Sequence, residues 1–446
     1  MNRRNFIKST ILASLSAPLL YSSNLKAEEF SNINFNQETY YKNSAQTIII
    51  FLYGGASQLA GNLTNIEEIK EYSQSNYDYF RGVTKTTNNF WKEAGGDYLE
   101  SLIDSNDINI FRNCFSQVRE DTSNKAHGVC VSENQRGNFD TSKMGILTNL
   151  AQILYENGVI NEDTNLPFIT MEGDSTFFAT GSKPTEPFLK PVGVNKNLEN
   201  PYERGSIRNW YYYTDEEMET EDYHEKFDPA LDLKMDNLAQ SINKDGKIKE
   251  AFGKRRGLKE FIDNIKSSPL PEGVSYDEDN LFAEKLRTAI KILSKNSDTK
   301  VISLGSGGLG GWDDHNDARE YVKRSEKLFS ALESAMKHIK LENKENEINI
   351  MVFGEFGRNV NLNSANGWDH GNLQNFYLLG GKGYFKEVGV VGETTVDNSG
   401  KINRLYLKPK GEFFEPMSIA SILYSIYGIE NPKELTDYPS IKNLLK

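Results

Sequence analysis

The run of residues at 46–53 sets the strongest limit on the fold. It reads Gln-Thr-Ile-Ile-Ile-Phe-Leu-Tyr and stops at Gly54-Gly55. From Ile48 onward the β-branched and aromatic residues do not alternate with polar ones, a pattern typical of a strand buried on both faces at the centre of an α/β sheet. We therefore expect a central strand here, followed by a tight turn.

Further strand-like runs alternate with segments of helical spacing. The runs lie at 108–111, 167–171, 300–304, 348–353 and 375–379. Apolar residues recur at helical spacing over Met144–Asn157, Leu281–Ser294, Tyr321–Ile339 and Pro416–Tyr427. This alternation predicts an α/β fold with a mostly parallel central sheet sandwiched by helices. With 446 residues, 37% of them hydrophobic, the chain can bury a sizeable core.

The stretch at 172–278 interrupts this alternation and predicts an inserted cap over the sheet. We expect helices in it near Met235–Ile242 and Ile248–Ile265. Its acidic cluster at 215–222 is interpreted as a solvated surface. The alternative, a calcium site, lacks the ligand spacing and the turn glycine of a calcium loop.

The first 27 residues have the features of an export signal. Arg3-Arg4-Asn5-Phe6-Ile7-Lys8 precedes an uncharged stretch that runs to Asn24, and the small residue Ala27 precedes Glu28. The paired arginines resemble a bacterial twin-arginine signal, which implies the twin-arginine export machinery as a partner and a periplasmic or otherwise exported mature chain, 28–446. The alternative, a membrane anchor, needs a longer apolar run. No later stretch is that long, so the mature protein is not expected to span a membrane.

Charge and cysteine content exclude several classes of protein. The chain has 51 basic and 63 acidic residues, a net charge of −12, and loss of the four basic residues in 1–27 takes it to −16. A nucleic-acid binder needs a basic surface, so no nucleic-acid partner is expected. The two cysteines, Cys114 and Cys130, exclude a disulfide framework and a cysteine-rich zinc site, although one disulfide stays open.

Two of the five histidines stand beside aspartates in loops that follow predicted strands. Asp313 and His315 follow the run at 300–304, and Asp369 and His370 follow the run at 348–353. Ligands of an open α/β sheet bind beyond the carboxyl ends of its strands. Carboxylate oxygen and neutral imidazole nitrogen suit zinc, manganese or iron, so the two pairs are candidate ligands of a divalent metal.

Each pair also has a purely structural interpretation. Asp313 or Asp314 could cap a helix that begins near Asp317, and Asp369 could simply orient His370. The remaining histidines give weaker signals. His338 lies on a charged predicted helix and His224 in the acidic insertion, and we expect both at the surface.

Four short motifs carry a family resemblance. They are Gly54-Gly55-Ala56, Gly311-Trp312-Asp313-Asp314-His315, Gly354-Glu355-Phe356-Gly357-Arg358 and Trp368-Asp369-His370-Gly371. Together they resemble the uncharacterised bacterial domain-of-unknown-function family "fifteen-oh-one", whose members often begin with a twin-arginine signal. That family is similar to the alkaline phosphatase and sulfatase superfamily. The resemblance spans about 46–428 in the same order, and it is poor in the middle third.

The resemblance implies a metal site that cleaves phosphate or sulfate esters. Asp313 and His315 would serve one metal, and Asp369 and His370 another or a shared one. The metal would activate a serine, threonine or water nucleophile and take up charge on the ester oxygens. Arg358 would clamp the anion through a bidentate contact, and Glu355 would order Arg358 or a metal-bound water. The structural alternative for Glu355 and Arg358 is an ion pair with each other.

The chain also departs from the family pattern. Ser57 stands where the family usually places an aspartate, which would weaken or remove one metal. His127 falls where the family carries a Ser-His-Phe segment, and we include it with Ser57, Glu355 and Arg358 among the candidate catalytic residues. Thr122, Ser123 and Ser57 are all candidate nucleophiles. The cysteine signature of sulfatases is missing around both cysteines, which argues against a formylglycine-type sulfatase.

Two functional hypotheses remain open. The first is an exported metal-dependent hydrolase that acts on an anionic small molecule or on envelope material. The second is a non-catalytic exported binding or scaffold protein on a hydrolase-like fold, which Ser57 favours. An anionic substrate would gain no long-range attraction from a chain of net charge −16 (51 basic residues less four in the signal, against 63 acidic), so local positive charge would have to supply it.

Overall fold

The computed structural model describes most of the chain outside the predicted signal and cap. It covers residues 30, 32–80, 82–171, 177–181, 186–194, 261–398 and 405–446, together with positions 233, 234, 237 and 241. The export signal predicted at 1–27 and the acidic cluster at 215–222, with His224, lie outside the described residues. So does most of the cap predicted at 172–278, including nearly all of its two expected helices; of the second, positions 261–265 are described and are helical.

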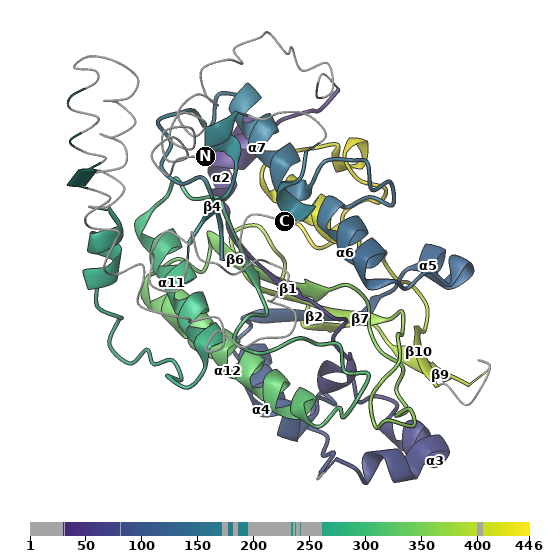
Figure 1. Ribbon diagram of the computed structural model, residues 1–446. Coiled ribbons are helices and arrows are strands. Elements are labelled where there is room, and N and C mark those ends of the chain that lie inside the picture. Colours follow the sequence, from purple (N-terminus) through teal and green to yellow (C-terminus); the bar gives the residue numbers. More distant parts are fainter. Residues whose placement is uncertain are drawn as a thin grey trace, which may run out of the picture.

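A sheet of eight strands forms the centre of the described structure (Figure 1). Its order is β4-β3-β5-β1-β6-β7-β2-β8. The strands are β1 Gln46–Leu52, β2 Ile108–Cys114, β3 Phe168–Thr170, β4 Val192–Gly193, β5 Val301–Gly305, β6 Ile348–Gly354, β7 Gln374–Gly380 and β8 Val390–Val391. Every pairing is parallel except the two made by β7. The predicted mostly parallel α/β sheet is therefore confirmed, with the run at 46–53 near its middle.

The antiparallel direction of β7 follows from its connection to β6. A parallel crossover normally passes through a helix on one face of the sheet. Residues 355–373, which join β6 to β7, contain no helix. The chain instead turns back, and β7 pairs directly with β6 in the antiparallel direction. The whole loop therefore stays at the carboxyl end of β6, beside the carboxyl ends of β1 and β5.

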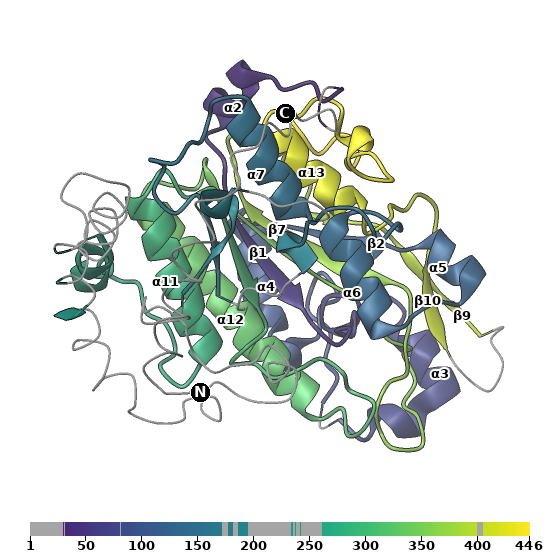
Figure 2. The same cartoon turned by 45° about the horizontal axis from the view of Figure 1, so that its top comes forward.

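Helices cover both faces of the sheet (Figure 2). Along β1, Ile48, Ile50 and Leu52 join one hydrophobic core, which includes α4, α11 and α12. Ile49 and Phe51 join a second core, which includes α7 and α13. Successive side chains of a strand point to opposite faces, so a strand covered on both sides needs apolar residues without alternation.

The four helical segments predicted at 144–157, 281–294, 321–339 and 416–427 are confirmed to within a few residues. The helices with both ends inside the described residues are α2 Gln37–Asn43, α3 Ile66–Tyr77, α4 Gly96–Asp104, α5 Gln117–Thr122, α6 His127–Arg136, α7 Ile146–Glu156, α11 Leu281–Lys295, α12 Glu320–Leu341 and α13 Ser418–Ile426. Short 3-10 turns lie at Leu59–Gly61, Lys92–Ala94, Phe177–Ala179, Pro187–Leu189 and Pro432–Glu434. A small hairpin of β9 Thr394–Asp397 and β10 Tyr406–Pro409 lies beside the main sheet.

The surface position predicted for His338 is wrong. His338 is only 1% exposed, and its Nδ1 atom lies 3.0 Å from the hydroxyl of Tyr276. It shares the buried face of α12 with Ala335 and Ile339, which lie three residues before it and one after it. Its neighbours Lys337 and Lys340 are exposed and half-buried, respectively, as expected for a helix with one apolar face.

Cys114 and Cys130 are both free and buried, so the disulfide left open by the sequence is not formed. Among the helices of the described ranges, none combines the length and the apolar character needed to cross a membrane.

Candidate metal site

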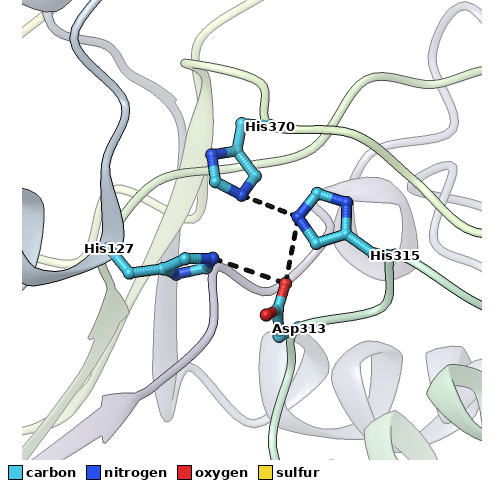
Figure 3. Close-up of side chains that lie close together, drawn as sticks. All are labelled: His127, Asp313, His315 and His370. Carbon is cyan, nitrogen blue, oxygen red and sulfur yellow. Dashed lines mark hydrogen bonds and ion pairs between the residues drawn. The ribbon is translucent and has the colours of Figure 1, made fainter.

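Four predicted site residues from three strand ends meet at the carboxyl edge of the sheet (Figure 3). Asp313 and His315 lie in the loop after β5, and His370 lies in the loop after β6. His127 is the first residue of α6, which follows β2 and α5. Because β2, β5 and β6 are parallel, their carboxyl ends face the same edge, where ligands of an α/β sheet bind.

The four side chains present their ligand atoms to one another. One ligand atom from each residue lies within 4.8 Å of all the others. The Nε2 atoms of His315 and His370 are 2.8 Å apart. Oδ1 of Asp313 lies 3.3 Å from His315 Nε2 and 3.4 Å from His127 Nε2. The three imidazoles and the carboxylate thus converge from different sides (Figure 3).

Two of the histidines form a hydrogen bond through Nδ1, the ring nitrogen that is not directed at the other ligand atoms. Nδ1 of His127 lies 2.7 Å from Oε2 of Glu355. Nδ1 of His370 lies 2.6 Å from the carbonyl oxygen of Lys125. A carbonyl oxygen only accepts, so His370 must be protonated at Nδ1, which leaves the Nε2 lone pair of its neutral form facing the cluster.

The third histidine has a carboxylate behind it. Nδ1 of His315 lies 3.6 Å from Oδ1 of Asp369, which also accepts from the Asn363 side chain at 3.1 Å. The structure therefore does not bring Asp369 into the group of four, although it brings in its neighbour His370. Asp369 lies where it can orient His315, not His370.

The local charges set the protonation states of these groups. Burial, together with the charge of Arg358, lowers the pKa of His370 to about 4, which keeps that imidazole neutral. Burial also disfavours charge on His127, but its hydrogen bonds to Asp313 and Glu355 outweigh burial and raise its pKa to about 9. For Asp313 the burial effect is outweighed by hydrogen bonds from His127 and Arg358, which hold its pKa well below the usual range.

Arg358 is buried beside the cluster and is not directed into solvent. Its side chain is 0% exposed, and its Nη2 atom lies 2.7 Å from Oδ1 of Asp313. Nε donates to the carbonyl oxygen of Gly55 at 2.7 Å, and Nη1 donates to that of Trp368 at 2.9 Å and approaches His315 Nε2 at 3.3 Å. The anion-clamping role expected of Arg358 stays a prediction, and in this conformation all three guanidinium nitrogens are engaged by the protein.

The structural interpretations offered for Asp313 and Asp314 do not hold. Helix α12 begins at Glu320 and has no side-chain cap. Asp314 is 5% exposed and forms an ion pair with Arg324. The ion pair considered as the structural alternative for Glu355 and Arg358 is not formed either, because each of these residues contacts a different member of the cluster.

The candidate hydroxyl nucleophiles lie outside the group of four ligands. Ser57 is 6% exposed, and its Oγ accepts from the backbone N–H of Leu59 at 3.4 Å. The Thr122 hydroxyl donates to the carbonyl oxygen of Val118 at 2.7 Å, and Ser123 ends α5 with a φ of 55°. The structure singles out none of the three as a nucleophile.

The donor set fits a divalent transition metal. Three imidazole nitrogens and one carboxylate oxygen match the four ligands that zinc binds, and manganese and iron accept the same atoms. A bound ion would have to displace the Nε2 proton that His127 donates to Asp313. Each imidazole also has an acceptor near its Nδ1 atom, which is the arrangement found behind most metal-binding histidines. The structure places the Nε2 atom of His127 with the ligand atoms of Asp313, His315 and His370, and the catalytic role predicted for His127 stays a prediction.

The sequence matches no protein-family model and no curated protein. Solved structures with a distant likeness include the following two. One is Ps i-CgsB in complex with k-i-k-neocarrahexaose, with a TM-score of 0.36 and 8% identity over 89% of this chain and 74% of that chain. The other is the phosphonate monoester hydrolase SpPMH from Silicibacter pomeroyi, with a TM-score of 0.39 and 12% identity over 89% of this chain and 75% of that chain. Likenesses this weak carry no conclusion about the site or its chemistry.

Proposed function

We propose that the protein is an exported hydrolase that uses one divalent metal ion, bound by His127, Asp313, His315 and His370, to cleave a phosphate or sulfate ester. The observation that carries this proposal is the convergence of their four ligand atoms within 4.8 Å at the carboxyl edge of the sheet. Without a metal, the Nε2 atoms of His315 and His370, 2.8 Å apart, would share one proton in a hydrogen bond, and a bound cation would take the place of that proton.

One metal fits the site better than two, because the neighbouring carboxylates have other partners. Asp314 pairs with Arg324, Glu355 accepts from His127 and from the Gly54 backbone, and Asp369 accepts from Asn363. The serine at position 57 removes the carboxylate that the family resemblance expects after β1. We therefore propose a single ion, in contrast to the two-metal alternative.

The residues of the site suit an anionic substrate that approaches from solvent. The side chains of His315 and Asp313 are 38% and 26% exposed, so the cluster is open on one side. A bound ion would supply positive charge to the non-bridging oxygens of an ester and lower the pKa of water. The Arg358 guanidinium keeps Asp313 ionised, which preserves an anionic ligand for the ion.

The location of the protein is part of the proposal. The pattern Arg3-Arg4-Asn5-Phe6-Ile7-Lys8 and the uncharged stretch behind it support export by the twin-arginine machinery, which carries folded proteins. A metal could then be bound before export. The N-terminus of the protein recovered from the periplasm tests this step: a mature chain that begins near Glu28 is expected, and an uncleaved cytoplasmic chain would contradict it.

Metal content and ester turnover together test the activity. Mature protein purified without chelator or affinity tag should contain one equivalent of zinc, manganese or iron by mass spectrometry, and His315→Ala should contain none. The loaded protein should hydrolyse aryl phosphate or aryl sulfate esters, and the variant should not. A metal-loaded protein without turnover on a broad panel of esters would favour the alternative, an exported binding or scaffold protein. Absence of metal after reconstitution would overturn the proposed site.

A further inference from the structure

The four residues 355–358, here called the bracket segment, contact the candidate metal ligands at both ends. Glu355 lies 2.7 Å from Nδ1 of His127, and Arg358 lies 2.7 Å from Oδ1 of Asp313. The Glu355 and Arg358 side chains are both 0% exposed. Neither therefore has a surface that a substrate could touch without displacement of other groups.

The centre of the bracket segment also contacts the cluster. The ring of Phe356 lies 4.4 Å from the His370 ring and 5.1 Å from the His127 ring, measured between centroids. Contacts at these distances limit the rotation of both imidazoles. The segment thus touches His127, Asp313 and His370, three of the four candidate ligands.

Both charged ends of the bracket segment bind the same residue of the turn after β1. The Gly54 N–H donates to Oε1 of Glu355 at 2.5 Å, and Arg358 Nη2 donates to the Gly54 carbonyl oxygen. Gly54 itself lies against the loop that carries Asp313: a Cβ at this position would be 2.5 Å from the Asp313 nitrogen. The turn after β1 is therefore fixed relative to the ligands on either side of it.

Side chains of helices α5 and α6 donate hydrogen bonds to backbone carbonyl oxygens at the start of the bracket segment. Arg119 donates through Nη1 to the Glu355 carbonyl oxygen at 2.8 Å. Asn134 donates to the carbonyl oxygens of Gly354 and Glu355 at 2.6 and 2.9 Å. Arg119 is in turn paired with buried Glu133 at 2.7 Å. The end of β6 and the helix that carries His127 are thus one connected unit.

We infer that Glu355 and Arg358 are positioning residues that fix the metal ligands His127 and Asp313, and that neither residue contacts the substrate. The inference rests on the proposed function and changes the role of Arg358 from an anion clamp to a support for Asp313. Hydrogen-bond partners behind metal ligands typically contribute about 10- to 100-fold to metal affinity.

The chemistry of each side chain defines the test substitutions. Glutamate at position 355 accepts two hydrogen bonds with its two oxygens, from Gly54 N–H and from His127. Glutamine has one oxygen, so Glu355→Gln keeps the shape but leaves one donor facing an NH₂ group. Lysine is a compact point charge, so Arg358→Lys keeps the charge but cannot reach Asp313 and the surrounding carbonyls together.

Zinc affinity measured against a chromophoric chelator tests the inference, with a buried control for each variant. Glu415→Gln changes a carboxylate that is 4% exposed and accepts from the Gln117 backbone. Arg112→Lys changes an arginine that is 4% exposed and donates to the carbonyl oxygens of Gly61 and Asn88. We expect zinc to bind about 10- to 100-fold more weakly in Glu355→Gln and Arg358→Lys, and about as in wild type in both controls.

A second readout separates positioning from substrate binding. At saturating zinc, KM for an aryl ester should stay close to the wild-type value in Arg358→Lys. An anion clamp would give the reverse result, a raised KM with unchanged zinc affinity, and that result would overturn the inference. Equal losses of zinc affinity in the controls would also overturn it, because they would show a general effect of buried substitutions.

Failure of the proposed function can be recognised independently. If wild-type protein bound no zinc, manganese or iron, the proposed function would fail, and the bracket segment would then be tested on metal-free protein by ¹⁵N NMR of the imidazoles. The His127 Nδ1–H signal should shift in Glu355→Gln and stay in place in Glu415→Gln. An unchanged signal in Glu355→Gln would show that Glu355 does not hold His127.

Discussion

The Nε2 atoms of His315 and His370 lie 2.8 Å apart, although the two residues are 55 positions apart in the chain. Two neutral imidazoles in this arrangement either share one proton or direct both lone pairs at one cation. The carbonyl of Lys125 holds the Nδ1–H of His370, so the lone pair of His370 faces His315. In the metal-free site this lone pair can accept the Nε2 proton of His315, and in the proposed site a cation would replace that proton.

Removal of either imidazole should abolish metal binding. His315→Ala and His370→Ala each delete one of four ligands, and we expect zinc affinity to fall by at least about 100-fold, more than the loss typical of a residue behind a ligand. Equilibrium competition with a chromophoric chelator measures the change. His338→Gln is the control, since His338 contacts Tyr276 and is not part of the cluster. Zinc binding as tight as wild type in His315→Ala would mean that the metal lies elsewhere.

Asp313 and Asp369 should differ in their effects, because only Asp313 points at the cluster. Asp313→Asn removes the anionic ligand and leaves Arg358 without its carboxylate partner, so we expect nearly complete loss of metal. Asp369→Asn removes a group 3.6 Å behind His315 and should weaken zinc binding about 10-fold. Mass spectrometry of the purified variants gives the metal content, and titration gives the affinity. Equal losses in both variants would place Asp369 among the ligands.

Hydrophobic periodicity explains both why the sequence predicts the central sheet and why it misses α6. Apolar runs such as the one that contains Ile48 and Ile50 identify buried strands, because water exclusion selects apolar side chains. The residues 132–136 of α6 are buried but polar. They are buried through hydrogen bonds, such as those of Asn134 to the end of β6, and such partners cannot be read from hydrophobic periodicity.

The candidate site was predicted in part, and the spacing of its residues explains the difference. Residues two apart in an extended segment point to the same side, and adjacent residues point to opposite sides. Asp313 and His315 lie instead in a tight turn, in which the His315 N–H donates to the Asp313 carbonyl oxygen at 2.9 Å, and their side chains meet at 3.3 Å. Asp369 and His370 are adjacent, and only His370 faces the cluster. His127 comes from a different helix, so its position depends on tertiary packing that the local sequence does not reveal.

Buried His338 should make the protein less stable in acid. Burial lowers its pKa from 6.5 to about 4. Because the folded-state pKa is lower than the unfolded one, the folded protein is favoured above pH 6.5, and this contribution is lost as the pH falls from 6.5 towards 4. A pKa lowered by this amount corresponds to a loss of about 3 kcal/mol in the free energy of unfolding once the pH is below both pKa values.

Urea unfolding at pH 7.5 and pH 4.5, with chelator to keep the metal site empty, measures this effect. When the pH is lowered from 7.5 to 4.5, the free energy of unfolding should fall by about 2 to 3 kcal/mol more in the wild type than in His338→Gln. The comparison between the two chains cancels the other titrating groups, which they share. Parallel pH profiles would show that His338 is equally protonated in the folded and unfolded states.

Gly54 allows the turn after β1 to approach Asp313, and its replacement should disturb both stability and metal binding. Its φ is 102°, and an added Cβ would lie 2.5 Å from the Asp313 nitrogen and 2.8 Å from the Trp312 carbonyl carbon. Backbone atoms cannot rotate away, so Gly54→Ala must move the loop that carries Asp313.

Gly389→Ala is a matched control, because Gly389 also has a positive φ, 66°, but no atom lies within 4 Å of its added Cβ. The control should lose about 1–2 kcal/mol from backbone strain alone and keep its zinc affinity. Gly54→Ala should lose more stability in urea and bind zinc more weakly, since the clash falls on a ligand. If both variants lost the same stability and kept full zinc affinity, the close approach of Gly54 to Asp313 would have no part in the geometry of the site.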